Sequence, residues 1–141
     1  MNEVLKYVYE VDGNDFMSAG VASADVKKNL KLLGFPGDVI KRVSIAMYEG
    51  EINMVIHANG GTATVEVCDD CITMVLADTG PGIADVELAM SEGYSTAPDR
   101  IRALGFGAGM GLPNMKKYCD EFRIETELGV GTTVFMKVCN T

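Results

Sequence analysis

Apolar residues in the first half of the chain follow two different periods. Residues 4–11 are rich in β-branched and aromatic types and lead into turn residues, which predicts an opening strand. From 15 to 33 the apolar residues recur every three or four positions with lysines between them, which predicts an amphipathic helix ending at Gly34. A second helix with the same period is expected from Asp38, which is placed to cap it, to the glycines after Asn59.

The second half of the chain is richer in strands. Two β-rich runs at 62–67 and 72–77 flank an acidic turn and predict a hairpin, and two more at 122–127 and 132–138 predict another. Between the hairpins, residues 91–105 are rich in Gly, Ser, Thr and Pro. This segment is longer than most connections in a compact domain, so we expect a functional lid, followed by a glycine-opened helix.

The order of these elements is strand, two helices, hairpin, lid, helix and hairpin. Such runs favour an α+β fold, here a two-layer α/β sandwich with a mixed sheet and the helices on one face. A length of 141 residues and an apolar content of 48% suit one compact core, and no linker or repeat divides the chain. We therefore expect a single domain over residues 1–141, with a ligand-sized region where the glycine loops meet.

The charge balance narrows the choice of partners. With 12 Lys and Arg against 20 Asp and Glu, the formal net charge is -8, which argues against a broad phosphate-binding surface and so against nucleic acid. The first residues lack a basic region followed by an apolar core, and no apolar run approaches the ~20 residues that a bilayer requires. We expect a cytoplasmic protein with no membrane partner.

The cysteines are too few for a disulfide framework in a chain of this size, so we expect reduced thiols. They are Cys68, Cys71, Cys119 and Cys139. Cys68 and Cys71 have the spacing of a CxxC motif, but no second pair completes a zinc site. We interpret them as two thiols that flank a hairpin turn, with metal or redox chemistry as the less favoured alternative.

One face of the second predicted helix carries polar groups at a fixed interval. Glu49, Asn53 and His57 recur every four residues, so they share a face of a helix otherwise filled with Ile, Val and Met. An Asn oxygen is a suitable ligand for Mg²⁺, and a Glu one turn away can accept a proton from a hydroxyl group or water. The stripe is equally consistent with the solvent face of the helix, and His57 is more typical of a hydrogen-bonding group at a helix end.

Two glycine-containing segments favour a nucleotide ligand. Residues 78–83 follow an apolar strand, where the Asp78 carboxylate can accept a hydrogen bond from an amine such as that of adenine, and glycines let a flat ring approach the backbone. Residues 105–111 open a helix, whose free N–H groups and positive dipole end favour polyphosphate. Taken alone, the first segment is also typical of a tight turn and the second of a flexible hinge. The chain has no Gly-Lys pair and no GxGxxG motif, which excludes a P-loop and a Rossmann fingerprint.

The combination of motifs is more specific than any one of them. In this order, Glu-x3-Asn-x3-His, Asp-x-Gly-x-Gly-Ile, Gly-x-Gly-x-Gly-Leu and Gly-x-Gly-Thr resemble the Bergerat fold of the GHKL ATPases, which include DNA gyrase, the large heat-shock chaperone, histidine kinases and MutL. The resemblance extends from the opening strand to Val138. Within that superfamily the chain looks most like the bacterial anti-sigma-factor serine/threonine kinases, particularly their switch-kinase branch, in the segments 49–53, 93–96, 109–120 and 127–134.

The resemblance implies a role for each matched residue. Glu49 is the implied catalytic base, Asn53 the Mg²⁺ ligand and Asp78 the partner of the adenine amine. The rest of the implied ATP-binding set is Gly80, Gly82, Ile83, Gly105, Gly107, Gly109, Met110, Gly111, Leu112 and Thr132, with Thr132 beneath the adenine near Asp78. Gyrase and MutL relatives use a lysine from a second domain at the terminal phosphate. Here Arg100 and Arg102 of the lid are expected to take that place, with solvent-exposed lid charges as the alternative.

By the same resemblance, the expected function is that of a serine/threonine protein kinase that uses ATP and Mg²⁺. Its implied substrate is a small anti-sigma-factor antagonist of the STAS type. Two other functions remain open, namely a nucleotide-gated module that sequesters a sigma factor or another regulator, and slow ATP hydrolysis coupled to an unrelated complex. Formation of a homodimer is also left open.

Overall fold

The structure, a computed structural model, describes residues 4–12, 20–58, 60–83, 90 and 111–140. In chain order its elements are β1 (Leu5–Asp12), α1 (Val21–Leu32), α2 (Gly37–Ala58), β2 (Gly60–Val67), β3 (Cys71–Ala77), α5 (Gly111–Tyr118), β4 (Glu121–Glu127) and β5 (Gly131–Cys139). The opening strand, the three helices and both hairpins predicted within these ranges are present. Their order along the chain is confirmed.

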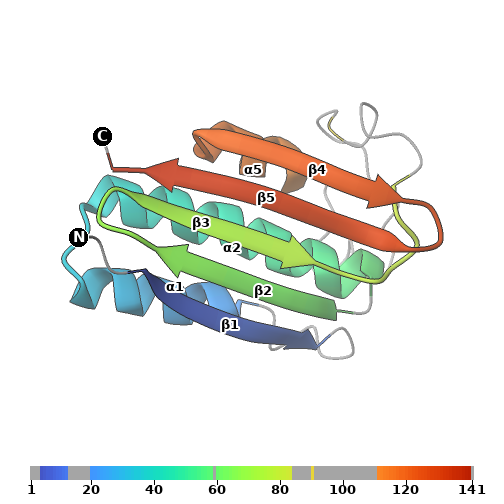
Figure 1. The fold of residues 1–141 in the computed structure, drawn as a ribbon, viewed down its shortest axis with the longest axis horizontal. Coiled ribbons are helices and arrows are strands. Elements are labelled where there is room, and N and C mark those ends of the chain that lie inside the picture. The colour runs from blue at the N-terminus through green and yellow to red at the C-terminus, as the bar shows by residue number, and fades with distance from the viewer. Residues whose placement is uncertain (1–3, 13–19, 59, 84–89, 91–110, 141) are drawn as a thin grey trace, which may run out of the picture.

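The strands form a five-stranded sheet in the order β1-β2-β3-β5-β4, so β1 and β4 are its edges (Figure 1). Every strand pair in the described residues is antiparallel, which corrects the expectation of a mixed sheet. The reason lies in the connection after β1. Two successive helices return the chain to the end where β1 stopped, so that Asp12 pairs with Gly60 at the start of β2.

Helices α1, α2 and α5 lie against one face of this sheet, as Figure 1 shows. The core lies between the two layers, and β3 illustrates how the sequence builds it. Ile72, Met74 and Leu76 are buried toward the helices, whereas the alternate residues Thr73 and Val75 are half-buried on the opposite face. The expected α+β fold with helices on one face is confirmed.

The start of α1 differs from the helix predicted over 15–33. Within the described residues the helix begins at Val21, and Gly20 before it has a left-handed φ of 100° that interrupts the predicted run. The cause is a side chain distant in sequence, because the carboxylate of Glu51 on α2 accepts the N–H groups of Gly20, Ala22 and Ser23. The other end agrees with the prediction, since α1 stops at Leu32 and φ is 83° at Gly34.

Asp38 does not cap α2 as expected. The helix already begins at Gly37, which places Asp38 in its first turn. There its carboxylate pairs with Nε of Arg42, one turn further along, at 3.1 Å. An acidic residue in the first turn still complements the helix dipole, so the position is favourable although its partner was not foreseen.

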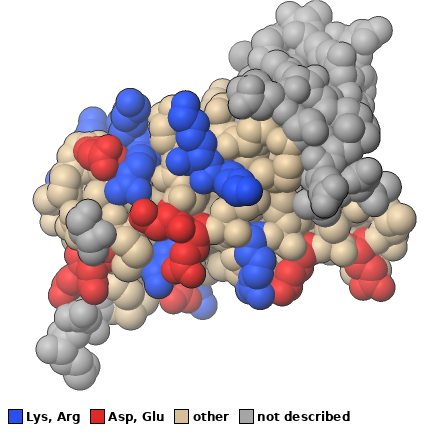
Figure 2. Space-filling view, turned by 90° about the horizontal axis from the view of Figure 1, so that it is seen from above, with Lys and Arg blue, Asp and Glu red and all other residues tan. Residues whose placement is uncertain are grey.

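The outward positions of edge strand β4 are all charged. Glu121, Arg123, Glu125 and Glu127 are exposed and alternate with half-buried residues. Figure 2 looks onto the side of the molecule that carries α5 and β4. Over its described part, Lys and Arg side chains lie beside Asp and Glu rather than forming one continuous patch of either sign.

Candidate functional site

Asp78 lies immediately after β3, and its side chain ties two segments together. Its Oδ1 atom accepts hydrogen bonds from the N–H of Gly80, at 3.0 Å, and of Thr132, at 3.1 Å. Its own N–H donates to the carbonyl oxygen of Thr132 at 2.9 Å. Within the described residues no group donates to Oδ2, so this second oxygen retains its capacity to accept a hydrogen bond from a ligand.

Two glycines allow the turn after β3 to pack against the turn between β4 and β5. Gly82 has φ +81°, and a Cβ atom there would lie 2.6 Å from the carbonyl oxygen of Glu127. Gly131 has φ +150°, and a Cβ atom there would collide with the carbonyl oxygen of Asp78. Both positions therefore require glycine for backbone conformation and for close backbone approach.

A pair of threonines supports the same turns from below. The Thr132 hydroxyl, on a residue that is 9% exposed, lies 2.9 Å from the hydroxyl of Thr126 on the neighbouring strand. The Thr126 oxygen also accepts the N–H of Ile83 at 2.8 Å. Sequence analysis placed Thr132 near Asp78 but missed Thr126. The available signal was register, since a tight hairpin sets Thr126 directly opposite Thr132.

Glu49 on α2 faces α5 and is half-buried there. Burial raises the pKa of its carboxyl above the ordinary value, and a hydrogen bond with the Asn114 side chain at the start of α5 opposes part of that rise. Asn53, one helical turn further along α2, is also half-buried. These two residues of the polar stripe are therefore partly shielded from solvent.

Glu51 is the buried carboxylate that sequence analysis missed. It is 2% exposed, and its two oxygens accept three main-chain N–H groups at the start of α1, at 2.9 to 3.1 Å. A signal was present in the helical period, because Glu51 stands four residues after Met47 and three before Met54, both of which are buried. An acidic residue at a core position needs internal donors, and Glu51 finds them on another helix.

Close packing joins α2 to α5 and, at one end of the sheet, to the Asp78 turn. A Cβ on Gly61 would lie 3.0 Å from Sδ of Met54 on α2 and 3.1 Å from Cα of Asp78. A Cβ on Gly50 would collide with the Leu76 side chain and lie 3.4 Å from Sδ of Met115 on α5. In Figure 1 this is the end where β3 stops and β5 begins.

Most of the expected site residues lie in the part of the chain that the structure describes. Those on the described elements are Glu49, Asn53, Asp78, Gly80, Gly82, Ile83, Gly111, Leu112 and Thr132. Gly111 opens α5, and Leu112 is buried beneath it. The other expected members lie outside the described residues, as does the side chain of His57: these members are Arg100, Arg102, Gly105, Gly107, Gly109 and Met110.

Comparison with known proteins identifies the family of this domain. A family model for histidine kinase-, DNA gyrase B- and HSP90-like ATPases matches residues 39–140. The chain therefore belongs to this family, and the resemblance noted in its motifs is confirmed. The family is named for ATPase activity, which makes ATP the expected ligand of the domain.

Relatives among well-described proteins cover almost the whole chain. The anti-sigma F factor of Clostridium acetobutylicum is 30% identical over 138 residues, which span 94% of this chain and 90% of the relative. The serine/threonine-protein kinase RsbT of Bacillus subtilis is 31% identical over 119 residues, 81% of this chain and 84% of the kinase. The chain is thus similar to both a sigma-factor regulator and a protein kinase.

A solved structure supports the fold. The crystal structure of the RsbU and RsbW domains of Rv1364c from Mycobacterium tuberculosis superposes with a TM-score of 0.64 at 16% identity. It covers 95% of this chain, which spans about a third of that longer protein, 32% of its length.

Among the described helices of the present chain, none has the length and apolar character needed to cross a bilayer.

Proposed function

We propose that this protein is a serine/threonine kinase that uses Mg-ATP to phosphorylate a small STAS-type antagonist of an anti-sigma factor. The observation that carries the proposal is the Asp78 carboxylate, which is fixed through one oxygen while the other accepts nothing from the described residues. Relatives named anti-sigma F factor and RsbT kinase favour this class of regulator. The position of Glu49 beside the start of α5 favours phosphoryl transfer.

The Asp78 turn suits adenine. Oδ2 of Asp78 would accept the exocyclic amine of the base, since Oδ1 is already committed to two main-chain donors. In our proposal the ring lies against the turn that contains Gly80 and Gly82, with Thr132 beneath it and Ile83 at its edge, because glycines let a flat ring approach the backbone closely. These contacts would select adenine over guanine, which carries a carbonyl oxygen in place of that amine.

The α2 stripe and the start of α5 suit the phosphates and the metal. Asn53 offers a neutral oxygen, a ligand that Mg²⁺ accepts in proteins. Gly111 and Leu112 are the first residues of α5. Main-chain N–H groups at the start of a helix have no partner within it and so favour an anion. In our proposal Gly105, Gly107, Gly109 and Met110 continue this cradle, and Arg100 and Arg102 reach the terminal phosphate.

Glu49 would take the proton from the substrate hydroxyl. Burial raises the pKa of the Glu49 carboxyl, which makes its ionised form a better proton acceptor than an exposed carboxylate. The hydrogen bond with Asn114 would hold the carboxylate toward α5. Bound Mg²⁺ would neutralise charge on the phosphates. The other requirement of phosphoryl transfer is alignment of the substrate hydroxyl with the terminal phosphate.

A labelling experiment tests the kinase proposal. Wild-type protein incubated with a STAS-type antagonist and Mg-[γ-³²P]ATP should transfer label to a serine or threonine of the antagonist. Glu49→Gln should reduce labelling by at least about 100-fold while ATP binding persists, because the base contributes typically 10²- to 10⁴-fold. The matched control is Glu66→Gln, which neutralises an exposed carboxylate on β2 and should leave labelling unchanged.

Calorimetry tests the ligand separately from the reaction. In Asp78→Asn, Oδ1 must still accept two N–H groups, so the amide nitrogen replaces Oδ2 and meets the adenine amine donor to donor. We expect ATP affinity to fall about 10- to 100-fold, with Asp70→Asn, in the exposed β2–β3 turn, unchanged. Asn53→Ala, or removal of Mg²⁺ with EDTA, should abolish the metal-dependent part of the affinity.

The outcomes separate the proposed kinase from the other functions. If wild type binds ATP and forms a stoichiometric complex with a sigma factor without labelling any antagonist, the protein is a nucleotide-gated binding module. Release of phosphate without label on any partner would instead indicate slow hydrolysis. Failure to bind any purine nucleotide would overturn the ligand as well as the reaction.

A further inference from the structure

Two cysteines face each other at the end of the sheet opposite Asp78. Cys71 opens β3 and Cys139 ends β5, and the two residues are direct partners in the antiparallel register. Their neighbours Ile72 and Val138 are buried toward the helices, so the alternation of a strand places both thiols on the opposite face. Both cysteines are free thiols and half-buried.

The register makes this cysteine pair the closer of the two antiparallel types. Asn140 N–H donates to the carbonyl oxygen of Asp70 at 2.6 Å, which marks the next pair along as hydrogen-bonded. Because the two pair types alternate, Cys71 and Cys139 form a non-hydrogen-bonded pair, with Cα atoms expected about 4.5 Å apart. That separation is within the range that a disulfide spans, about 4.4 to 6.8 Å.

The two thiols already interact. The pKa of Cys139 is raised to about 11, first by a hydrogen bond with the Cys71 side chain and then by burial. The ammonium group of Lys137, on the same face of β5, has a raised pKa, chiefly because of Glu121 and to a smaller extent because Cys71 and Cys139 are near it. The register agrees with this, because the side chains of a non-hydrogen-bonded pair lie side by side on one face of the sheet.

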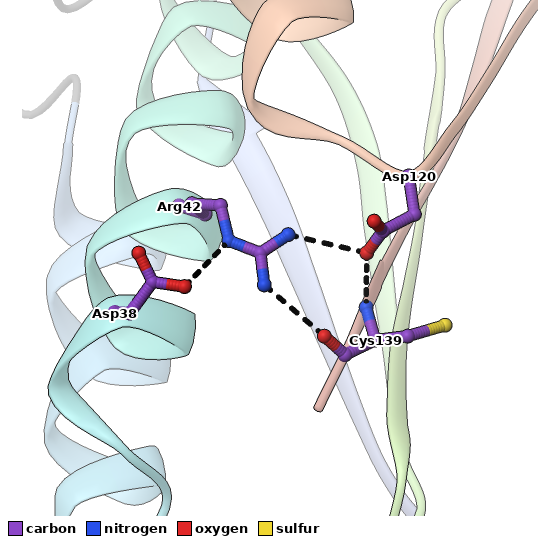
Figure 3. A network of polar contacts seen from close by, with 4 residues as sticks. All are labelled: Asp38, Arg42, Asp120 and Cys139. Carbon is purple, nitrogen blue, oxygen red and sulfur yellow. Dashed lines mark hydrogen bonds and ion pairs between the residues drawn. The ribbon is translucent and has the colours of Figure 1, made fainter. Parts of the chain in front are cut away.

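A polar network holds Cys139 in this position, as Figure 3 shows. Arg42 donates from Nη2 to the carbonyl oxygen of Cys139 at 3.1 Å, and Cys139 N–H donates to Oδ2 of Asp120 at 2.6 Å. Arg42 also pairs with Asp120 at 3.1 Å, which closes the network. In the figure the Cys139 sulfur points away from Arg42 and α2, so the network fixes the backbone and leaves the thiol directed elsewhere.

We propose that Cys71 and Cys139 are a redox modification site that forms a reversible disulfide by exchange with a low-molecular-weight disulfide such as oxidised glutathione. One thiolate attacks the oxidant, which releases one thiol and leaves a mixed disulfide on the protein. The second cysteine then attacks that mixed disulfide and releases the other thiol. The protein loses two electrons and two protons, and the sulfur–sulfur bond of the oxidant becomes two thiols.

The competing product is a bond between Cys68 and Cys71. Cys68 N–H donates to the carbonyl oxygen of Cys71 at 2.9 Å, so these residues also stand opposite each other across the β2–β3 turn. Cys68 and Cys71, however, are a hydrogen-bonded pair, with Cα atoms expected about 5.5 Å apart, so the Cys71 side chain lies closer to Cys139. Within the described residues no three His, Cys, Asp or Glu side chains are grouped to hold a metal ion, so oxidation is favoured over metal binding at these thiols.

Thiol counting and peptide mapping test the proposal on the folded full chain. Oxidised glutathione should reduce the number of titratable thiols from the four of the reduced chain to about two, and mapping should find the peptides of Cys71 and Cys139 linked. Cys68→Ser and Cys119→Ser should still form the bond, whereas Cys71→Ser and Cys139→Ser should not. A link between Cys68 and Cys71, a persistent mixed disulfide, or four remaining thiols would each overturn the proposal.

Thermal unfolding gives a second readout. The bond would close the long loop from 71 to 139, so oxidation should raise Tm of the wild type by about 10 °C, and dithiothreitol should reverse the shift. Cys139→Ala should show no such shift in Tm. The control variant Cys119→Ala should retain it. A wild-type Tm that oxidation leaves unchanged or lowers would contradict the linkage.

Discussion

The carboxylates at the two ends of the molecule differ in burial and in whether they pair with a cation, although Asp120 at the far end also accepts the N–H of Cys139. Near the candidate site, Glu51 and Asp78 accept main-chain N–H groups, and Glu51 is almost fully buried. At the other end Asp38 and Asp120, whose side chains are 75% and 46% exposed, pair with Arg42. A buried acceptor cannot be replaced by water, whereas an exposed ion pair can. We therefore expect substitution of a single carboxylate to reduce stability strongly at the site end and only weakly at the far end.

The largest effect is expected at Glu51. Glu51→Ala removes the acceptor of three N–H groups at the start of α1 and leaves a cavity, which should lower the free energy of unfolding by about 3 kcal/mol or more. Urea unfolding measures the change. Glu66→Ala, on the exposed face of β2, is the control and should stay within about 0.5 kcal/mol of wild type. A loss below about 1 kcal/mol in Glu51→Ala would contradict the comparison.

A smaller loss is expected at Gly131. Gly131→Ala combines an unfavourable φ with a collision at the Asp78 carbonyl, and should cost about 2 to 3 kcal/mol and weaken ATP binding. Gly129→Ala is the matched control, because Gly129 has φ +78° but nothing lies within 4 Å of its Cβ position. Its cost should be about 1 kcal/mol and ATP affinity should be unchanged. Equal losses in the two variants would mean that backbone approach at Asp78 is unimportant.

At the far end, Arg42→Ala should have a moderate effect. The Arg42 side chain is 21% exposed and donates to two carboxylates and to the Cys139 carbonyl oxygen, so we expect a loss of about 1 to 2 kcal/mol in urea unfolding. Asp38→Ala removes only the exposed partner one turn away and should cost no more than about 0.5 kcal/mol. If Asp38→Ala lowers stability as much as Arg42→Ala, the Asp38–Arg42 pair within α2 would matter more than the contacts of Arg42 with Asp120 and Cys139.

The smallest effect is expected from acid. The N–H of Cys139 and, secondarily, the Arg42 guanidinium hold the pKa of Asp120 below its ordinary value of 3.8. A lowered folded-state pKa contributes stability that is present above the unfolded pKa and is lost as pH falls through the folded value. The stability gap between wild type and Asp120→Asn should therefore be constant from pH 7 to about 5 and close in stronger acid. A gap that widens in acid would reverse this sign.

Much of the fold could be predicted because its signals are local. The 3.6-residue period gave α2 almost to its ends, and both hairpins follow from β-rich runs around short turns. One error occurs where a distant residue takes part. Gly20 interrupts the predicted first helix, and Glu51 on another helix accepts its N–H. The Asp38 error is local instead, because α2 begins one residue earlier and Asp38 pairs with Arg42 one turn along the same helix.

The candidate site divides in the same way. The family resemblance implies the proximity of Thr132 to Asp78, and the structure places them in hydrogen-bond contact. Thr126 could not, because its role depends on the register of β4 against β5. The role of Glu51 could not be predicted for a similar reason. Only the packing of the helices shows that Glu49 faces α5 whereas Glu51 binds the start of α1.

The charged border along β4 has a consequence for how copies of this protein meet. An edge strand has unpaired main-chain groups that invite a strand from another molecule, and outward charges are a common protection against such aggregation. A second copy that approached β4 would bring its own Glu121, Glu125 and Glu127 against the same glutamates. This repulsion, stronger at low salt, would oppose the pairing of β4 with a strand of another copy.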